Sequence, residues 1–172
     1  MVRQKNRWLL VHFEFEPDVM ASSKKRKLTS SSEDNASRNI ETIKAIQQVN
    51  ASDIYRSLNQ EIMQNFGLVG ACISDVQVKL YDPKAQLAII KTTRDKYPQV
   101  RSCLTFLTEI KQGVDTLKVV ASTIAVSGCA RTARNAAWEE VKKRFFVRDF
   151  STDIEKELQE LEECLDQIDS GC

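Results

Sequence analysis

The residue types that usually carry catalysis are few in this chain, and they do not stand in a catalytic pattern. His12 is the one histidine, and no serine or cysteine in a recognisable nucleophile context accompanies it. The five glycines form no phosphate-cradling loop of the Walker or dinucleotide type. Because no acid, base, nucleophile or metal constellation stands out, we expect no catalysis by this chain alone.

The cysteines are five in number and widely spaced, with no CxxC pair among them. This pattern fits neither the usual zinc sites nor a disulfide framework. We expect reduced thiols in a cytosolic or nuclear compartment. The residues are Cys72, Cys103, Cys129, Cys164 and Cys172.

Basic side chains carry the clearest chemistry, which is binding to phosphate groups. Three groups are candidates, and each also has a plainer interpretation. The first could be a solvated terminus, the second a solvated run of charge and the third an ordinary helix cap. The groups are Arg3, Lys5, Asn6 and Arg7; Lys91, Arg94 and Lys96; and Ser127, Gly128, Arg131 and Arg134.

The third group has a composition suited to anion binding. Gly128 permits close approach of the backbone, and the amides at the start of the helix predicted to follow point outward. Arg131 and Arg134 share one face of that helix, so a phosphate could bind between them and the amides.

Charge is distributed unevenly along the sequence, although the formal net charge is only +1. Residues 1–27 hold seven basic and three acidic side chains, a net charge of +4. Residues 149–172 hold one lysine and nine acidic side chains, a net charge of −8, which leaves residues 1–148 at +9. A basic folded part is typical of a phosphate-binding surface.

The length of 172 residues suits one domain with polar extensions. No apolar run approaches the ~18 residues that a membrane span needs, and no signal-peptide core follows the basic start. We therefore expect a soluble protein that is neither secreted nor bound to a membrane.

Apolar periodicity indicates the elements that would position the basic groups. Residues 8–15 are aromatic and β-branched and predict a first strand, with Phe13 and Phe15 on one face and His12 and Glu14 on the other. The remaining predicted elements are a helix from Asp53 to Gly67 capped by Ser52 or Asp53; strands at 73–81 and 87–92 joined by a turn at Asp82, Pro83 and Lys84; a second helix capped by Asp95, with an apolar face from Val100 to Ile110; a strand at 117–126; and a third helix at 130–144.

Two segments lie outside this series of elements. Residues 20–38 are Ser-rich with no periodic apolar face, which predicts a flexible insertion. Residues 149–172 form an acidic extension in which Ile154, Leu158, Leu161, Leu165 and Ile168 recur at helical spacing. This spacing predicts an amphipathic helix, which would pack either on this domain or against another protein.

The order of elements is β-α-β-β-α-β with C-terminal helices appended. We therefore predict an α+β fold of the ferredoxin-like kind over residues 1–148, with two helices on one face of a four-stranded antiparallel sheet. The usual single-strand RNA-binding mode of that fold stacks bases on aromatic residues of the central strands, and the strand at 87–92 has none. Basic groups at strand and helix ends suit the phosphates of a structured RNA instead.

Several segments resemble a known family. The opening MVRQKNRWLL resembles the MVR-K-RYLL start of the Pop-five subunits of ribonuclease P and ribonuclease MRP, with Trp8 at the aromatic position. Residues 91–95 are similar to a basic strand end of that family, with Thr92 and Thr93 in place of its Cys-His/Arg pair. Residues 126–132 are similar to its V-S-G-T-I-[RK] stretch, with Cys129 and Ala130 replacing Thr and Ile.

This resemblance implies a protein cofactor of an RNA enzyme that cleaves precursor transfer RNA at its 5′ end, the MRP form acting on precursor ribosomal RNA. The RNA would supply catalysis with bound magnesium, while this chain would bind no cofactor and would stabilise the catalytic core of the RNA. Implied partners are that RNA, a TIM-barrel subunit called Rpp-thirty and a second small α/β subunit. Lys24, Lys25, Arg26 and Lys27 form a candidate nuclear localisation signal, so we expect the nucleus and within it the nucleolus.

Two other functions stay open at this point. One is an assembly adaptor that binds proteins without touching RNA. The other is a stand-alone nuclease, which the missing acid, base and metal constellation disfavours.

Overall fold

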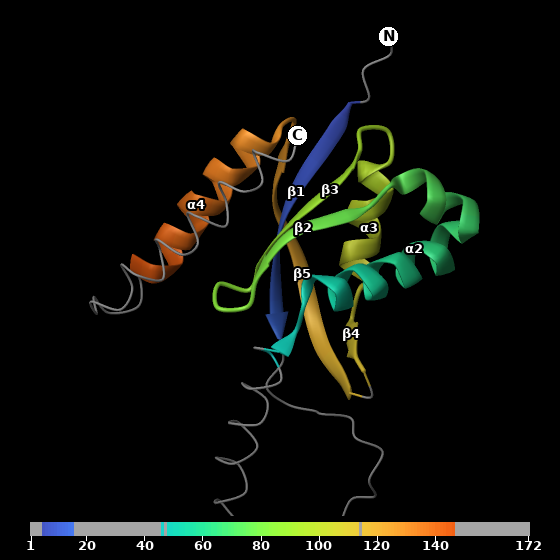
Figure 1. The fold of residues 1–172 in the computed structure, drawn as a ribbon, viewed down its shortest axis with the longest axis horizontal. Coiled ribbons are helices and arrows are strands. Elements are labelled where there is room, and N and C mark those ends of the chain that lie inside the picture. Colours follow the sequence, from blue (N-terminus) through green and yellow to red (C-terminus); the bar gives the residue numbers. More distant parts are fainter. Residues whose placement is uncertain (1–4, 16–45, 47, 114, 147–172) are drawn as a thin grey trace, which may run out of the picture.

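The computed structural model describes residues 5–15, 46, 48–113 and 115–146. These residues form a five-stranded sheet with helices on both of its faces (Figure 1). The elements are β1 (Asn6–Phe15), α2 (Ala51–Ser74), β2 (Gln77–Asp82), β3 (Leu87–Thr93), α3 (Tyr97–Phe106), β4 (Glu109–Gln112), β5 (Asp115–Ser127) and α4 (Ala130–Phe146).

The sheet has the strand order β2-β3-β1-β5-β4, and every neighbouring pair is antiparallel. The strands β2, β3, β1 and β5, with α2 and α3 as the crossover helices, reproduce the split βαβ arrangement. The predicted α+β, ferredoxin-like class is therefore confirmed. The expected number of strands is wrong by one, because β4 adds a short strand at the edge beside β5.

The alternation of side chains along β1 divides the interior into two cores. Leu9, Val11 and Phe13 face α2 and α3 and belong to the larger core, which those two helices cover. Trp8 and Leu10 face the opposite side, where they join Ala133, Ala137 and Val141 of α4 in the smaller core. Figure 1 shows α4 on one side of the sheet and α2 with α3 on the other. The predicted third helix therefore closes the second face of the sheet.

The helix α2 is longer than its sequence pattern predicts, because Gly67 does not end it. Gly67 has φ 71° and ψ −180°, a backbone conformation that is essentially restricted to glycine, and it kinks the helix without stopping it. The apolar run after Gly67 continues as helix to Ser74, so the strand predicted from residue 73 begins only at Gln77. The N-cap is Asn50, whose backbone amide donates to Asp53 Oδ2 at 3.2 Å.

The second predicted helix is shorter than expected. It begins at Tyr97 after Lys96, not after Asp95, and Pro98 occupies its first turn, where a proline is tolerated. Ile110 was expected on the apolar face of this helix but lies in β4. Leu107 and Ile110 are both buried three residues apart, so burial alone does not separate a helix from a turn followed by a strand.

The two edges of the sheet differ in how they are protected. Lys79 sits where the pairing of β2 with β3 shifts register, and a lysine at such an irregularity disfavours pairing with another strand. The outer side of β5 pairs with β4 only over Asp115–Lys118. Beyond that point no described strand pairs with it, and residues 119–128 carry no charged side chain. Val120, Ile124 and Val126 are exposed along this open stretch.

The insertion predicted at residues 20–38 and the acidic extension at 149–172 lie outside the described residues. Among the helices that are described, none combines the length and the apolar character needed to span a membrane.

Candidate nucleic-acid interface

The three basic groups predicted from the sequence meet at one end of the sheet. In the strand register, Trp8 of β1 lies opposite Lys91 of β3 on one side and opposite Ser127 of β5 on the other. Because β1 runs antiparallel to both neighbours, its beginning lies beside their ends. We call this region the basic end; its members are Lys5, Asn6, Arg7, Lys91, Arg94, Lys96, Ser127, Gly128, Arg131 and Arg134.

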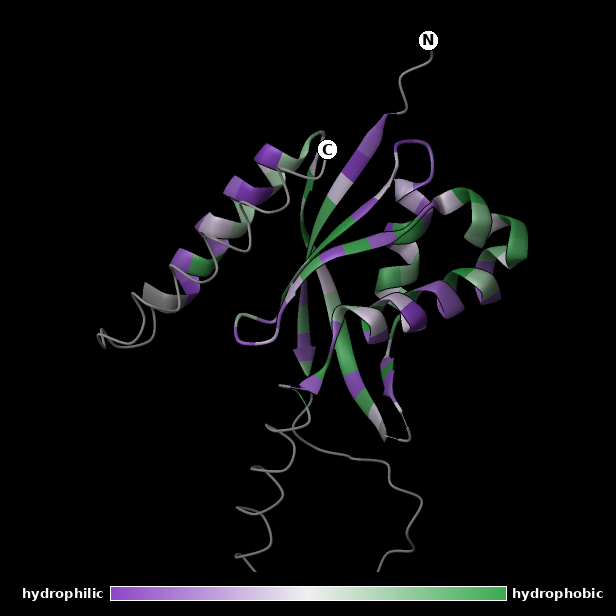
Figure 2. Ribbon diagram, in the orientation of Figure 1, coloured by the Kyte–Doolittle hydropathy of each residue, from purple (hydrophilic) through white to green (hydrophobic). Residues whose placement is uncertain are grey.

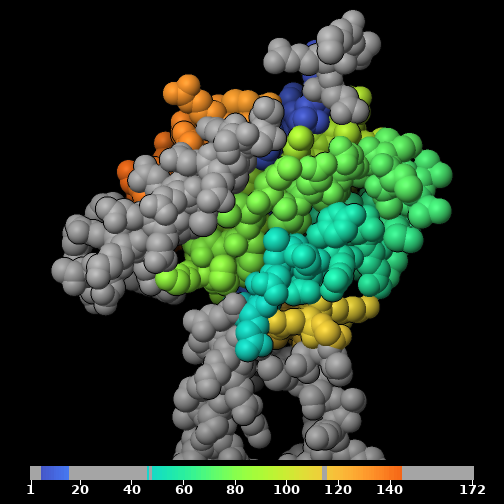
Figure 3. Space-filling model, in the orientation of Figure 1, coloured from blue at the N-terminus to red at the C-terminus, as the bar shows by residue number. Residues whose placement is uncertain are grey.

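Direct contacts join the first group to the other two. The Arg94 amide donates to the carbonyl oxygen of Lys5 at 2.8 Å, which extends the ladder between β1 and β3. Arg7 Nη1 donates to the carbonyl oxygen of Asn6 at 3.2 Å, and it lies 3.8 Å from the place where a Cβ on Gly128 would stand. Figure 3 shows the start of β1 in blue at the upper end of the molecule, next to the yellow-green chain after β3 and the orange start of α4.

The side chains of the basic end point to both sides of the sheet. Lys91 is half-buried, and its Nζ lies 5.7 Å from the ring centroid of Trp8, over the smaller core. This cation–π contact fixes a lysine whose role the sequence pattern left open between binding and solvation. Arg7 immediately precedes Trp8 on β1, so its side chain leaves the strand on the opposite face of the sheet. Lys5, Arg94 and Arg131 are exposed, while Lys96 and Arg134 are half-buried.

The start of α4 is held by a local cap. Thr132 Oγ1 donates to the carbonyl oxygen of Cys129 at 3.0 Å, and the Ala133 amide reaches the same oxygen at 3.3 Å. Ala130 is buried against the smaller core, so the family position that it occupies faces the sheet and not the solvent. Arg131 points outward from the first turn, where the helix dipole favours negative charge.

Gly128 is not required by the fold. Its φ lies outside the left-handed region, and an added Cβ would meet only Arg7 Nη1 at an ordinary contact distance. Among the described residues, none comes close enough to the backbone at this position to require a glycine. A glycine that the fold does not need is consistent with an outside group approaching the backbone.

Thr92 has a structural role. It is 1% exposed, and its Oγ1 donates to the carbonyl oxygen of Ser74 at 2.6 Å. This hydrogen bond ties the end of β3 to the end of α2. The departure from the family pattern at this position is thus buried and does not alter the exposed surface of the basic end. Arg3, the remaining predicted site residue, lies outside the described residues.

His12 shows no catalytic environment. Burial and the nearby guanidinium of Arg144 lower the pKa of its imidazole, while Glu14 and Glu140 act in the opposite direction. The buried thiol of Cys103 has its pKa raised to about 11, chiefly by burial and further by Glu61, which suppresses the reactive thiolate.

Within the described residues no group of three or more His, Cys, Asp or Glu side chains could hold a metal ion.

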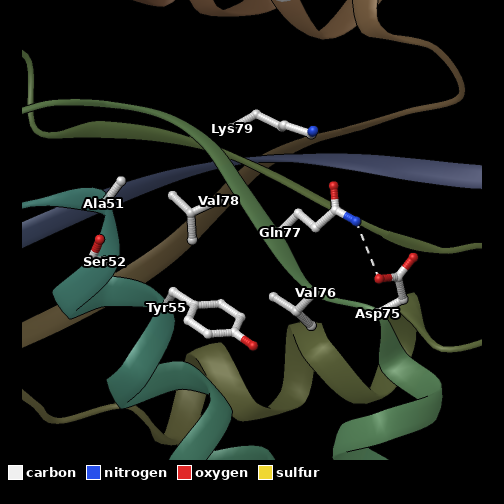
Figure 4. A pocket seen from close by; sticks show the side chains of 8 residues that line it. All are labelled: Ala51, Ser52, Tyr55, Asp75, Val76, Gln77, Val78 and Lys79. Carbon is white, nitrogen blue, oxygen red and sulfur yellow. Dashed lines mark hydrogen bonds between the residues drawn. The ribbon is translucent and has the colours of Figure 1, made fainter. Parts of the chain in front are cut away.

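A cavity of about 430 Å³ lies between the start of α2 and β2 (Figure 4). Gln77 Nε2 donates to Asp75 Oδ1 at 3.2 Å within it, so this carboxylate is engaged by an amide and not by the hydroxyl of Ser52. A nucleophile needs a base within hydrogen-bond reach. The cavity therefore offers no activated nucleophile. Its lining residues are Ala51, Ser52, Tyr55, Asp75, Val76, Gln77, Val78 and Lys79.

An exposed apolar surface on α2 was not foreseen from the sequence. Leu68 and Val69 are 67% and 69% exposed, and Phe66 and Ile73 are also exposed. Figure 2 shows this stretch around the kink as a hydrophobic end of the helix. We call these four residues the apolar tip of α2. The signal was present in the apolar run after Gly67, but the predicted helix ended at Gly67 and Ile73 was assigned to the strand that follows.

The fold and the basic end together define a small α+β domain of the ferredoxin-like class, in which basic groups from separate parts of the chain meet at one end of the sheet. A family model described as the Rpp14/Pop5 family matches residues 7–138, which is well over half of the chain, and the chain belongs to this family. The resemblance found in its opening residues is thereby confirmed.

Known proteins that are similar to this chain include a plant protein and a chain of a yeast ribonucleoprotein. A protein of Arabidopsis thaliana named "Probable ribonuclease P/MRP protein subunit POP5" is 25% identical over 118 residues, covering 67% of this chain and 75% of that protein. A chain in the cryo-EM structure of yeast ribonuclease MRP is 11% identical with a TM-score of 0.43, covering 100% of this chain and 99% of the other.

Proposed function

We propose that this chain is a non-catalytic protein subunit of the ribonuclease P and ribonuclease MRP ribonucleoproteins, in which its basic end binds the phosphate backbone of the RNA component. Its family and the name of the Arabidopsis relative support the assignment to that complex. The observation that carries the RNA contact is the convergence of three separate basic groups on one row of the sheet.

The geometry favours phosphate binding over base reading. Exposed guanidinium and ammonium groups suit phosphate oxygens, which give affinity and position without sequence information. The strands at this end offer Trp8 as an aromatic ring, but it is 4% exposed and lies beneath Lys91, so it is closed to base stacking. The chain would thus stabilise a folded RNA for cleavage of precursor transfer RNA and precursor ribosomal RNA in the nucleus and nucleolus.

In this proposal magnesium belongs to the RNA component. The described residues of this chain hold no cluster of metal ligands to take it. The chain would contribute positive charge and a rigid surface, while the chemistry of phosphodiester cleavage would take place on the RNA.

The apolar tip of α2 is the surface that we assign to a protein neighbour in the same complex. Exposed leucine and valine side chains in one contiguous stretch are typical of protein interfaces. The second small α/β subunit and the TIM-barrel subunit Rpp-thirty are the candidates for that neighbour.

The test reverses one exposed charge in each basic group. A variant with Lys5→Glu, Arg94→Glu and Arg131→Glu should bind the RNA component at least about tenfold more weakly at moderate salt, since each reversal removes a phosphate contact and adds repulsion. The measurement is a filter-binding or electrophoretic titration of the RNA with the purified chain.

The matched control reverses three lysines at the opposite end of the sheet: Lys84→Glu, Lys111→Glu and Lys118→Glu. It has the same net charge as the test variant, so any difference between the two reports position and not total charge. Equal binding by the two variants would overturn the RNA contact at the basic end. If crosslinking of the assembled particle then placed all RNA adducts on other subunits, the protein-only adaptor would replace this proposal.

A further inference from the structure

The outer face of α4 is a charged helix surface that no other described element covers. Arg131, Asn135, Glu139, Lys142 and Lys143 are exposed on it, and α4 as a whole holds five basic and two acidic side chains, a net charge of +3. Figure 2 shows hydrophilic stretches recurring along α4. Glu140 pairs with Lys143 at 2.9 Å and lies 3.9 Å from Arg144, and the net charge of +3 is what remains after both glutamates are counted.

Apolar surface adjoins these charges. Trp138 of α4 and Leu80 of β2 both pack at the margin of the smaller core and are only half-buried. Lys142 Nζ lies 4.9 Å from the ring centroid of Trp138. A ligand suited to this surface combines acidic groups with an apolar stripe.

The chain itself contains a segment of that composition. Residues 152–168 hold seven acidic side chains and one lysine, a net charge of −6. The same 17 residues carry isoleucine or leucine at positions 154, 158, 161, 165 and 168, the spacing of one face of a helix. This segment lies outside the described residues, so its pairing with α4 is argued from its sequence and from where the described chain ends.

Lengths and connection fit an antiparallel pairing. The helix α4 has 17 residues and would match a helix over residues 152–168, each about 25 Å long at a rise of about 1.5 Å per residue. Five residues, 147–151, join the two, which is within the range of about two to eight common between antiparallel helices. In that arrangement acidic residues of the segment would face basic residues at both ends of α4. The two helix dipoles would be antiparallel, which is the favourable orientation.

We propose that residues 152–168 dock antiparallel along the outer face of α4 of the same chain, with the apolar stripe against Trp138 and the carboxylates among the basic side chains. The docked segment screens the positive charge of α4. This pairing does not depend on the RNA-binding role proposed above, and its test contains no RNA.

A zero-length carbodiimide crosslink on the full-length chain tests the contact, because it joins a carboxylate only to an amine that touches it. The expected result is a bond from Lys142 or Lys143 to residues 153–169, found by peptide mass spectrometry. It should be lost at about 1 M KCl, where the screening length falls to about 3 Å. An equal mixture of isotope-labelled and unlabelled chain distinguishes bonds within one chain from bonds between two chains.

The matched control, Lys142→Arg with Lys143→Arg, keeps the charge of α4 but removes both amines. It should lose the crosslinks and still shield Trp138 from acrylamide as the parent chain does. Deletion of residues 149–172 should increase quenching of Trp138 by about twofold, because the half-buried ring becomes open to solvent. In a Trp138→Phe variant, the buried Trp8 is the remaining tryptophan, and the deletion should leave the acrylamide quenching of its fluorescence unchanged.

Three outcomes would overturn the proposal. Crosslinks that form equally at Lys84, Lys111 and Lys118 would show a segment without a docking site. Bonds found only between labelled and unlabelled chains would assign the face to a second copy. Quenching of Trp138 that is unchanged by the deletion would show that the segment does not cover this surface, which would leave α4 to a partner protein.

Discussion

The hydroxyl group of Tyr81 is an exception to the rule that buried polar groups find a partner. Its oxygen is buried at the margin of the larger core without a hydrogen-bond partner among the described residues. Burial and the neighbouring Asp82 raise the pKa of this phenol far above its usual value, so it stays neutral. The ring itself is well placed, since it meets Phe13 edge-on with centroids 6.2 Å apart.

We expect Tyr81→Phe to leave the protein as stable as the parent or to stabilise it by up to about 1 kcal/mol, because the change removes an unsatisfied polar group and keeps the ring. Urea unfolding followed by circular dichroism measures this free energy. Tyr55→Phe is the control, since the 42% exposed Tyr55 should be indifferent to the loss of its hydroxyl. A loss of more than about 1 kcal/mol at position 81 would reveal a partner for the hydroxyl in solution.

At the scale of elements, α4 depends on small residues. Ala130, Ala133, Ala137 and Val141 recur along its buried face, and Trp8 and Leu10 of β1 complete the contact. Alanine at successive turns lets the helix axis approach the sheet closely, so the smaller core has little spare volume.

Ala137→Leu should therefore destabilise the fold by about 1–3 kcal/mol, since the added methyl and methylene groups must displace α4 from the sheet. Asn135→Leu places the same side chain on the exposed outer face and should change stability by less than about 0.5 kcal/mol. Denaturant titration of the two variants side by side checks the difference. Similar values for both would mean that α4 packs loosely.

The sequence predicted the strands and helices wherever one periodicity held over a whole element. The strand from Trp8 is such a case, whereas the helix from Ala130 was predicted from its run of good helix-forming residues. The class of fold followed from the order of the elements. The predicted end of the first helix at Gly67 was wrong, because a glycine after an apolar helical stretch usually marks a helix C-terminus. The sequence does not show that the helix continues beyond the kink. It also missed β4, since four residues are too few to display an alternation.

The basic residues of the site were identified from the sequence, but their meeting was not. Lys91 and Ser127 are far apart along the chain, and only the register through Trp8 places them in one row. The apolar tip of α2 was missed for a related reason. Apolar residues predict burial in a lone domain, whereas a surface kept for a neighbour has the same composition.

At the scale of the whole molecule, the described residues concentrate positive charge at one end of the strands. Seven lysine and arginine side chains gather at the basic end, and like charges so placed repel one another in the free chain. This repulsion lowers the stability of the free chain, and the RNA phosphates of the proposed function would relieve it.

The consequence is a stability that depends on salt and on position. Changing Lys5, Arg94 and Arg131 to alanine should raise the free energy of unfolding by about 0.5–1 kcal/mol at low ionic strength, and the gain should shrink as salt screens the repulsion. Alanine at Lys84, Lys111 and Lys118 removes the same charge from the other end and should give less than half of that gain. Thermal unfolding at a series of KCl concentrations tests both, and equal gains would refute a polar distribution.

The open stretch of β5 bears on the life of the chain before assembly. Beyond Val119, whose backbone amide donates to the carbonyl oxygen of Thr108 at 2.9 Å, the backbone groups on the outer side of β5 meet no described strand. Exposed Val120 and Ile124 would make pairing with a foreign strand apolar. We therefore expect the purified chain to aggregate through this edge as its concentration rises, and to stay in solution longer when it is dilute.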